Sequence, residues 1–320
     1  MTAAGSGGDP GAAAPEKAWL PYRRARAAAP RARVVAFHWA GGSASSYNAY
    51  PLHLPDDVEL LAVQLPGREK RKAEAAPASA RAAAAAAAAA LGGVLGDVPY
   101  VVFGHSMGTL VAFEFAREVR RRGLPAPKLC VFSNFPAPQT PPAERPWRVS
   151  AGLSEAEFKD ECRAWGVKPV VMTASFWPQF HLPFRADFKI FDQYEYAAEA
   201  PLGVPIKVFL SDRDPKVTRG LVEGWRAQTL AAEHFEVVPF AGDHFYLGER
   251  PTIPLVAKKL AALVRATLAG DFDCPDLGAL TLDAKGGAKE APTAAGAAAA
   301  AAVAAEADAD DYDPFGFGDD

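Results

Sequence analysis

The chain has 320 residues, of which 50% are hydrophobic and 22% charged, close to the average of globular proteins, so wholesale disorder is excluded. Its net charge at pH 7 is −4, but residues 301–320 hold seven of the 38 acids and none of the 34 bases, which leaves +3 on residues 1–300. A nearly neutral domain with an acidic tail lacks the dense basic stripe expected of a nucleic-acid-binding protein.

The two ends of the chain are predicted to lie outside the folded domain. Residues 1–17 are small, polar and interrupted by Pro and Gly, which predicts a disordered leader. Residues 271–320 form a low-complexity, Ala-rich acidic tail that ends in DYDPFGFGDD. We expect this tail to be a solvated end, and a short docking motif around residues 314–317 is the alternative.

The sequence shows no sign of a membrane span or a secretory signal. No stretch reaches the roughly 18 strongly apolar residues that a span needs, and the N-terminal region lacks a leucine-rich segment. The three cysteines are odd in number and far apart, which favours reduced thiols over a disulfide framework. We therefore expect a cytoplasmic monomer, while the Arg-rich residues 23–33 leave organellar targeting open.

Between the two ends, short apolar runs alternate with helical segments over residues 18–270. This alternation predicts one α/β domain with a mostly parallel sheet that helices cover on both faces. The predicted strands, in chain order, are residues 34–37, 58–64, 100–103, 129–133, 206–210 and 235–239. The predicted helices are residues 78–91, 107–122, 154–165, 221–230 and 253–268.

One segment, residues 136–200, interrupts the alternation. It is rich in Trp, Phe and Pro, and within it residues 154–165 are predicted to be helical because Ser154 and Glu157 form a capping box. An insertion of this length between two strands predicts a lid over the carboxyl edge of the sheet.

The third predicted strand runs into Gly104-His105-Ser106-Met107-Gly108, a G-x-S-x-G motif that a helix follows. A strand–turn–helix setting is what a nucleophile elbow needs, because it places the serine on a tight turn with its Oγ exposed. The sequence therefore predicts Ser106 as a nucleophile, with an ordinary Gly-rich turn as the alternative. The backbone N–H of Met107, at the start of the helix, can face a developing oxyanion.

A serine nucleophile needs a base, and the base needs an acid that orients it. In an α/β-hydrolase the order along the chain is Ser, acid, His, each in a loop after a strand. Of the six histidines, His244 meets this requirement, because it follows the strand 235–239.

The acid is expected in the loop after the strand 206–210. We predict Asp214, which Pro215 fixes, and keep Asp212 as the second choice. Asp243 is a weaker candidate because a residue can rarely bond the ring nitrogen of its neighbour, so a local capping role is expected for it.

A second oxyanion donor is expected from the loop after the first strand, His38-Trp39-Ala40-Gly41-Gly42. The paired glycines permit a backbone turned toward the site, so the N–H of Trp39 or Ala40 is the candidate. A plain Gly-Gly turn is the alternative. The later turn Pro66-Gly67-Arg68 is interpreted as the end of a strand with an exposed arginine and no catalytic part.

Taken together, five segments resemble the type II thioesterases, stand-alone α/β-hydrolases that serve polyketide, nonribosomal peptide and fatty acid synthesis. The resemblance covers about residues 19–268 and neither terminal tail. The segments that carry it are FHWAGGSASSY (37–47), VQLPGREKR (63–71), VVFGHSMGTLVAFEFAR (101–117), LPFRADFKIFDQYEY (182–196) and FAGDHFYL (240–247).

The resemblance implies hydrolysis of acyl thioesters on the phosphopantetheine arm of an acyl or peptidyl carrier protein, with no cofactor or metal. It implies a triad of Ser106, Asp214 and His244 and oxyanion amides at Ala40 and Met107. The family usually has Pro where His38 stands and Gly where Ser211 stands, so the loop beside the oxyanion hole could be shaped differently. Some lid aromatics are expected to line the acyl channel, drawn from Phe176, Trp177, Phe180 and Phe184.

Three alternatives remain at this point. An esterase or lipase of the same fold would act on free small esters. An acyltransferase would replace water by another nucleophile. A catalytically inactive hydrolase would serve as a binding module through the acidic tail.

Overall fold

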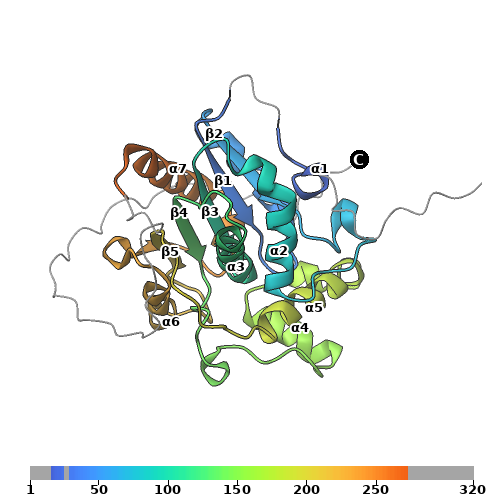
Figure 1. The fold of residues 1–320 in the computed structure, drawn as a ribbon. Coiled ribbons are helices and arrows are strands. Elements are labelled where there is room, and N and C mark those ends of the chain that lie inside the picture. Colours follow the sequence, from blue (N-terminus) through green and yellow to red (C-terminus); the bar gives the residue numbers. More distant parts are fainter. Residues whose placement is uncertain (1–15, 25–28, 273–320) are drawn as a thin grey trace, which may run out of the picture.

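A computed structural model describes residues 16–24 and 29–272. Its centre is one six-stranded sheet in the order β2-β1-β3-β4-β5-β6, in which every neighbouring pair is parallel (Figure 1). All six predicted strands are confirmed, with ends shifted by a few residues. The strands are β1 (Ala32–Phe37), β2 (Val58–Val63), β3 (Tyr100–His105), β4 (Leu129–Ser133), β5 (Ile206–Ser211) and β6 (Glu236–Phe240).

Helices cover both faces of the sheet, as predicted. Helices α2 and α3 lie on one face and α7 lies on the other (Figure 1). Side chains alternate along each strand between the two faces and form two apolar clusters, one under α2 and α3 and one under α7. The helices are α1 (Glu16–Trp19), α2 (Ala80–Leu91), α3 (Met107–Arg121), α4 (Glu155–Ala164), α5 (Trp177–Asp192), α6 (Arg219–Glu223) and α7 (Ile253–Ala269).

Two predicted boundaries are wrong. The leader was expected to run to residue 17, but α1 begins at Glu16, because Trp19 is buried and the Arg71 guanidinium lies 4.3 Å from the centre of its ring. The predicted helix 221–230 is short: α6 ends at Glu223 and a 3₁₀ turn, Gly224–Gln228, follows. The rest of the leader, residues 1–15, and the tail from residue 273 lie outside the described residues.

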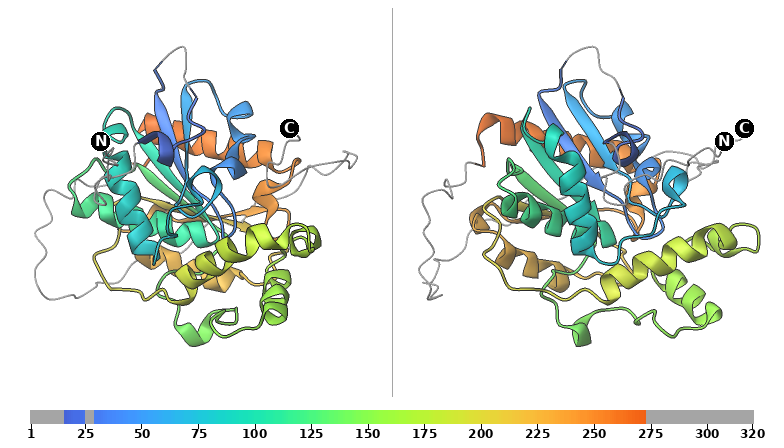
Figure 2. Two further views of the ribbon diagram at one scale, coloured as in Figure 1. Left: turned by 90° about the vertical axis from the view of Figure 1, so that its right-hand side faces the viewer. Right: turned by 45° about the vertical axis from the view of Figure 1, so that its right-hand side comes forward.

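The segment between β4 and β5 contains α4 and α5, which lie together beyond the end of the sheet toward which the strands point (Figures 1 and 2). Helix α4 was predicted from its capping box, and Ser154 and Glu157 form that box. Helix α5 was not predicted. It carries Pro178 in its first turn and Pro183 in its interior, and buried aromatic side chains hold it in place.

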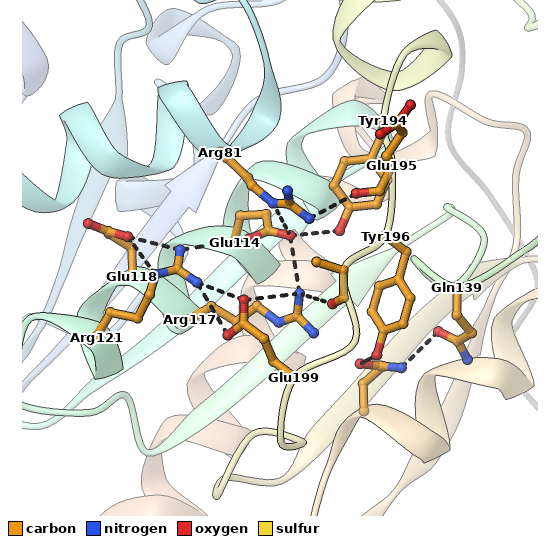
Figure 3. A network of polar contacts seen from close by, with 12 residues as sticks. Arg81, Glu114, Arg117, Glu118, Arg121, Gln139, Tyr194, Glu195, Tyr196 and Glu199 are labelled. Atoms are coloured by element: carbon orange, nitrogen blue, oxygen red, sulfur yellow. Dashed lines mark hydrogen bonds and ion pairs between the residues drawn. The ribbon is translucent and has the colours of Figure 1, made fainter.

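The chain returns from α5 to the sheet across α2 and α3, where a polar network fixes it (Figure 3). Glu114 of α3 is buried at the centre and accepts a hydrogen bond from Tyr194 Oη at 2.7 Å. Arg117 pairs with Glu114 at 3.4 Å and donates to the Ala197 carbonyl at 3.0 Å. This network ties the end of the lid to the helix that follows Ser106. Over the part of the chain that the structure describes, no helix is both long and apolar enough to cross a membrane.

Candidate active site

Ser106 lies between the end of β3 and the first turn of α3, on a strained turn. Its backbone has φ 52° and ψ −129°, a conformation that a residue with a Cβ rarely adopts. The two motif glycines allow the strand and helix to approach: a Cβ at Gly104 would lie 2.5 Å from the Gly108 carbonyl oxygen, and one at Gly108 would clash with the carbonyls at the end of β1. The sequence predicted this elbow from its glycine spacing.

The structure brings Ser106, His244 and Asp214 together from three separate loops. Ser106 Oγ lies 2.8 Å from His244 Nε2, and His244 Nδ1 lies 2.6 Å from Asp214 Oδ2. Because a carboxylate can only accept, Nδ1 carries the ring proton and Nε2 is left to accept the serine hydroxyl proton. The imidazole is 1% exposed, and the Trp165 ring packs edge-on against it at 4.8 Å.

Asp214 is positioned by its own loop. Its Oδ1 accepts the backbone N–H groups of Lys216 at 2.9 Å and Val217 at 2.8 Å, which leaves Oδ2 for His244. Burial alone would raise the pKa of Asp214, but the electrostatic interaction and hydrogen bond with His244 and the two amides outweigh it, so the pKa lies below its usual value. The carboxylate therefore stays ionised beside the ring.

The two other acids considered for this role do not contact the imidazole. Asp212 Oδ1 accepts the Gly242 N–H at 2.9 Å, and its carboxylate is exposed. Asp243 caps its own loop by accepting the Phe245 N–H at 2.8 Å. Of the three acids considered, Asp214 is the one that lies within hydrogen-bond distance of His244, and its catalytic role stays a prediction.

The loop after β1, residues 38–42 (the HWAGG loop), forms the opposite wall of the site. Gly42 N–H donates to Trp39 O at 3.0 Å, closing a tight turn in which Gly41 has φ +74°. Ala40 lines the same small cavity as Ser106 and His244. Met107 is the first residue of α3, where backbone N–H groups have no acceptor within the helix.

This cavity is small because the lid fills it. It holds about 10 Å³ of free volume, and a second cavity of about 20 Å³ shares part of its wall and continues toward Lys168 and Glu249. Lid residues and the loop after His244 form the roof. The roof residues are Trp165, Val167, Phe184, Phe188, Phe191 and Phe245. Among the aromatics singled out from sequence, Phe184 therefore reaches this cavity.

Sequence reasoning was wrong about Arg68. It was expected to be exposed, but it is 5% exposed and forms a bidentate pair with Asp187 of α5, with both N–O distances 2.7 Å. The partner stands 119 residues away in the chain, so no local pattern points to it. His38 is also buried beside this pair, and burial, helped by the Arg68 charge, lowers its pKa to about 3. The ring is therefore neutral.

A second group that the sequence left unassigned is His105, the residue before the nucleophile. His105 Nδ1 lies 2.9 Å from Ser133 Oγ, which lies 2.8 Å from Tyr246 Oη. The imidazole is fully buried behind His244, with 5.3 Å between the two ring centres. Within the described residues there is no cluster of three or more His, Cys, Asp or Glu side chains that could hold a metal ion.

A parallel sheet with a serine elbow after β3, an acid after β5 and a histidine after β6 defines the α/β-hydrolase fold. The sequence model of the family "Thioesterase domain" matches residues 32–263 of the chain. The chain belongs to this thioesterase family.

Relatives and solved structures agree with that assignment. The gramicidin S biosynthesis protein GrsT of Aneurinibacillus migulanus is 32% identical over 223 residues, which cover 69% of this chain and 85% of the relative. The RedJ thioesterase from the prodiginine biosynthetic pathway in Streptomyces coelicolor is 31% identical with a TM-score of 0.67, covering 77% of this chain and 92% of RedJ. YbtT, a type II thioesterase from the yersiniabactin NRPS/PKS biosynthetic pathway, is 27% identical with a TM-score of 0.64, covering 77% and 96%.

Proposed function

We propose that this protein is a type II thioesterase that hydrolyses acyl thioesters on carrier proteins, for editing or product release in a polyketide or nonribosomal peptide pathway. The observation that carries the proposal is the hydrogen-bonded series from Ser106 through His244 to Asp214 in a chain of the thioesterase family. The kind of pathway is inferred from the relatives, since YbtT comes from the yersiniabactin NRPS/PKS biosynthetic pathway and RedJ from the prodiginine biosynthetic pathway.

The first step is acylation of the serine. His244 Nε2 takes the proton of Ser106 Oγ, and the Oγ attacks the thioester carbonyl carbon. The ionised Asp214 holds the ring and stabilises the imidazolium that forms. The negative charge on the carbonyl oxygen is stabilised by the N–H groups of Ala40 and Met107, each contributing about 3 kcal/mol. The C–S bond then breaks, and the imidazolium protonates the leaving thiolate.

The second step is hydrolysis of the acyl-serine. His244 removes a proton from a water molecule, which attacks the same carbonyl carbon and passes through a second tetrahedral intermediate. Collapse of this intermediate returns the proton to Ser106 Oγ and releases the carboxylic acid. The water molecule supplies the hydroxyl group of the acid and the proton that returns to Ser106, so the second step balances.

The partner in this proposal is an acyl or peptidyl carrier protein, whose pantetheine arm delivers the thioester. We further propose that the enzyme acts in the cytoplasm as a monomer. Two of its cysteines, Cys130 and Cys162, are buried and unpaired, which suits a reducing compartment.

The test is hydrolysis of carrier proteins loaded with acyl groups from C2 to C16, by the wild-type protein and by Ser106→Ala. We expect the wild type to release acid faster from carriers than from p-nitrophenyl esters of the same acyl group. Ser106→Ala is expected to fold normally and to lose turnover by a factor of about 10⁶. Turnover of simple esters with none on any carrier would move the function to the esterase alternative, which no present observation favours.

A further inference from the structure

The backbone of the HWAGG loop is hydrogen-bonded to one carboxylate of the lid helix α5, that of Asp187. Gly41 N–H donates to Asp187 Oδ2 at 2.8 Å. Arg68 occupies both oxygens of the same carboxylate and donates through Nη1 to the Gly42 carbonyl at 3.0 Å. The Asp187 side chain is fully buried, so these contacts are formed away from water. The lid, the HWAGG loop and the turn after β2 therefore meet at a single carboxylate.

Hydrogen bonds fix both the peptide plane that carries the proposed oxyanion donor and the peptide plane that follows it. The N–H of Ala40 belongs to the Trp39–Ala40 peptide, whose carbonyl accepts Gly42 N–H at 3.0 Å and His38 Nδ1 at 2.8 Å. The next peptide presents the Gly41 N–H, which Asp187 accepts. A rotation of either plane would break a hydrogen bond to a buried group, and such losses are costly. The direction of the Ala40 N–H is thus set by its neighbours.

Helix α5 also packs against Gly41 through an aromatic ring, that of Phe184. Phe184 and Asp187 are three residues apart on α5 and so share one face of the helix. A Cβ on Gly41 would lie 2.5 Å from the Phe184 ring, and φ +74° at this position also favours glycine. The lid helix therefore contacts Gly41 through a ring on its Cα and a carboxylate on its N–H.

We propose that Asp187 and Arg68 are positioning residues for the oxyanion hole, which hold the HWAGG loop so that the Ala40 N–H points at the substrate carbonyl oxygen. This inference rests on the proposed acyl transfer to Ser106. It makes the second oxyanion donor dependent on the place of α5, so that the hole is complete only while the lid helix lies over the sheet edge. Displacing a reacting group by about 1 Å can cost roughly 100-fold in rate.

A purely structural role for the pair makes a different prediction. A buried ion pair that only held the lid would, when broken, lower stability and slow every substrate equally. A pair that aims an oxyanion donor would matter most for substrates whose carbonyl atom accepts hydrogen bonds strongly. Oxygen accepts more strongly than sulfur, so replacing the carbonyl oxygen by sulfur separates the two roles.

The experiment compares kcat/KM for p-nitrophenyl acetate and for its thiono analogue, in which sulfur replaces the carbonyl oxygen. The variants are Asp187→Asn, which places an amide where Arg68 and Gly41 donate, and Arg68→Lys, which keeps the charge but loses the bidentate fork. Glu114→Gln is the matched control, because it is also a buried carboxylate that ties the lid to the domain (Figure 3). Circular dichroism and thermal melting establish the folded fraction of each.

For Asp187→Asn we expect the oxygen ester to lose about 10- to 100-fold and the thiono ester less than threefold. Arg68→Lys is expected to lower the ratio of kcat/KM for the oxygen ester to kcat/KM for the thiono ester in the same way, by a smaller factor. If Asp187→Asn fails to fold, Arg68→Lys tests the positioning role in its place. Equal losses on both esters, which leave this ratio as it is in the wild type, would overturn the inference.

Failure of the proposed function gives a different result. If the wild type hydrolyses both esters but no carrier thioester, the substrate class is wrong and the ester ratio still tests the role of Asp187. If the wild type hydrolyses neither ester and does not react with a fluorophosphonate, both proposals are overturned.

Discussion

Two fully buried carboxylates, Asp187 and Glu114, are among the groups that join the lid to the domain, and they differ in the groups that they contact. Asp187 of α5 accepts hydrogen bonds at both oxygens, and one donor is the N–H of Gly41, next to the cavity that Ser106 lines. Glu114 of α3 accepts from Tyr194, in the segment that follows α5, and its other neighbours are arginines (Figure 3). Both side chains are fully buried.

Burial and charge therefore do not by themselves mark a functional carboxylate. Both groups would be costly to leave unpaired. Of the two carboxylates, Asp187 accepts a hydrogen bond from the backbone N–H next to a proposed oxyanion donor. A change at Asp187 can therefore move a reacting group, whereas a change at Glu114 cannot do so directly. The pair at Glu114 ends on side chains and on the carbonyl of Ala197. We therefore expect rate effects from one attachment and stability effects from the other.

Among the buried carboxylates, the largest effect on rate is expected at Asp214, and it sets the scale for Asp187 and Glu114. Asp214→Asn leaves the shape intact but favours the wrong tautomer of His244, so kcat on a carrier-bound thioester is expected to fall by roughly 10⁴. Asp212→Asn, in the same loop but exposed and without contact to the ring, is the matched control and should stay within twofold of wild type. A loss below tenfold for Asp214→Asn would remove this residue from the triad.

At Glu114 we expect a large change in stability and no change in rate. Glu114→Ala removes the buried carboxylate that pairs with Arg117 and leaves it Glu199 at 3.9 Å, and removing one member of a buried pair costs about 3 kcal/mol of unfolding free energy. Urea unfolding measures this loss, and kcat measured well below the unfolding midpoint should stay within twofold. A tenfold fall in kcat for the folded variant would show that both attachments act on the reaction.

The pH dependence of stability tests the buried state of two histidines next to the active site. Burial, and then the charge of Arg68, lowers the pKa of His38 to about 3. Burial, followed by the electrostatic interaction with the neighbouring His244, lowers the pKa of His105 well below its usual value. In the unfolded chain both rings bind a proton near pH 6.5, whereas the folded protein keeps them neutral. The unfolded state thus binds more protons below that pH, so the free energy of unfolding falls as the pH is lowered.

The expected slope is about 1.4 kcal/mol per pH unit for each ring between pH 6 and pH 4.5. Urea unfolding at several pH values measures it. His38→Gln should reduce the slope by the contribution of one proton. An unchanged slope in His38→Gln would contradict the neutral, buried state of that ring.

The smallest effect is expected at the exposed edge of the Glu114 network. The Arg121 side chain is 39% exposed and pairs with Glu118 at 2.9 Å and Glu199 at 3.0 Å (Figure 3). Exposed ion pairs of this kind contribute at most about 1 kcal/mol. Arg121→Ala should therefore change the unfolding free energy by no more than that in urea and leave kcat unaltered. A larger loss would mean that the network acts as one unit rather than through its buried core.

The sequence predicted what is local in this fold. Each strand is a short apolar run, the elbow is a contiguous motif, and the loops that carry Asp214 and His244 follow strands in a fixed order, so each could be recognised without knowing its neighbours. The roles of these residues remain predictions until they are tested by substitution. Helix α5 was missed because Pro178 and Pro183 interrupt its pattern, while tertiary packing of its aromatic face stabilises it.

What the sequence could not predict is long-range pairing. Arg68 looked like an exposed turn residue because its partner Asp187 lies in a helix that was not recognised. The contact of Gly41 with that carboxylate spans 146 residues, and no spacing rule connects the two. The paired glycines of the HWAGG loop did give a usable signal, since they marked a backbone that had to turn. They could not show that the lid completes the turn.

The rate at which a fluorophosphonate labels the protein, with the labelled residue identified by peptide mass spectrometry, tests both the nucleophile and the positioning role of Asp187. Phosphonylation needs the same nucleophile, base and oxyanion donors as acylation. We predict a single label on Ser106, a rate about 10- to 100-fold slower in Asp187→Asn, and a rate unchanged in Glu114→Gln. A label on another residue, or equal slowing in the two variants, would contradict the account.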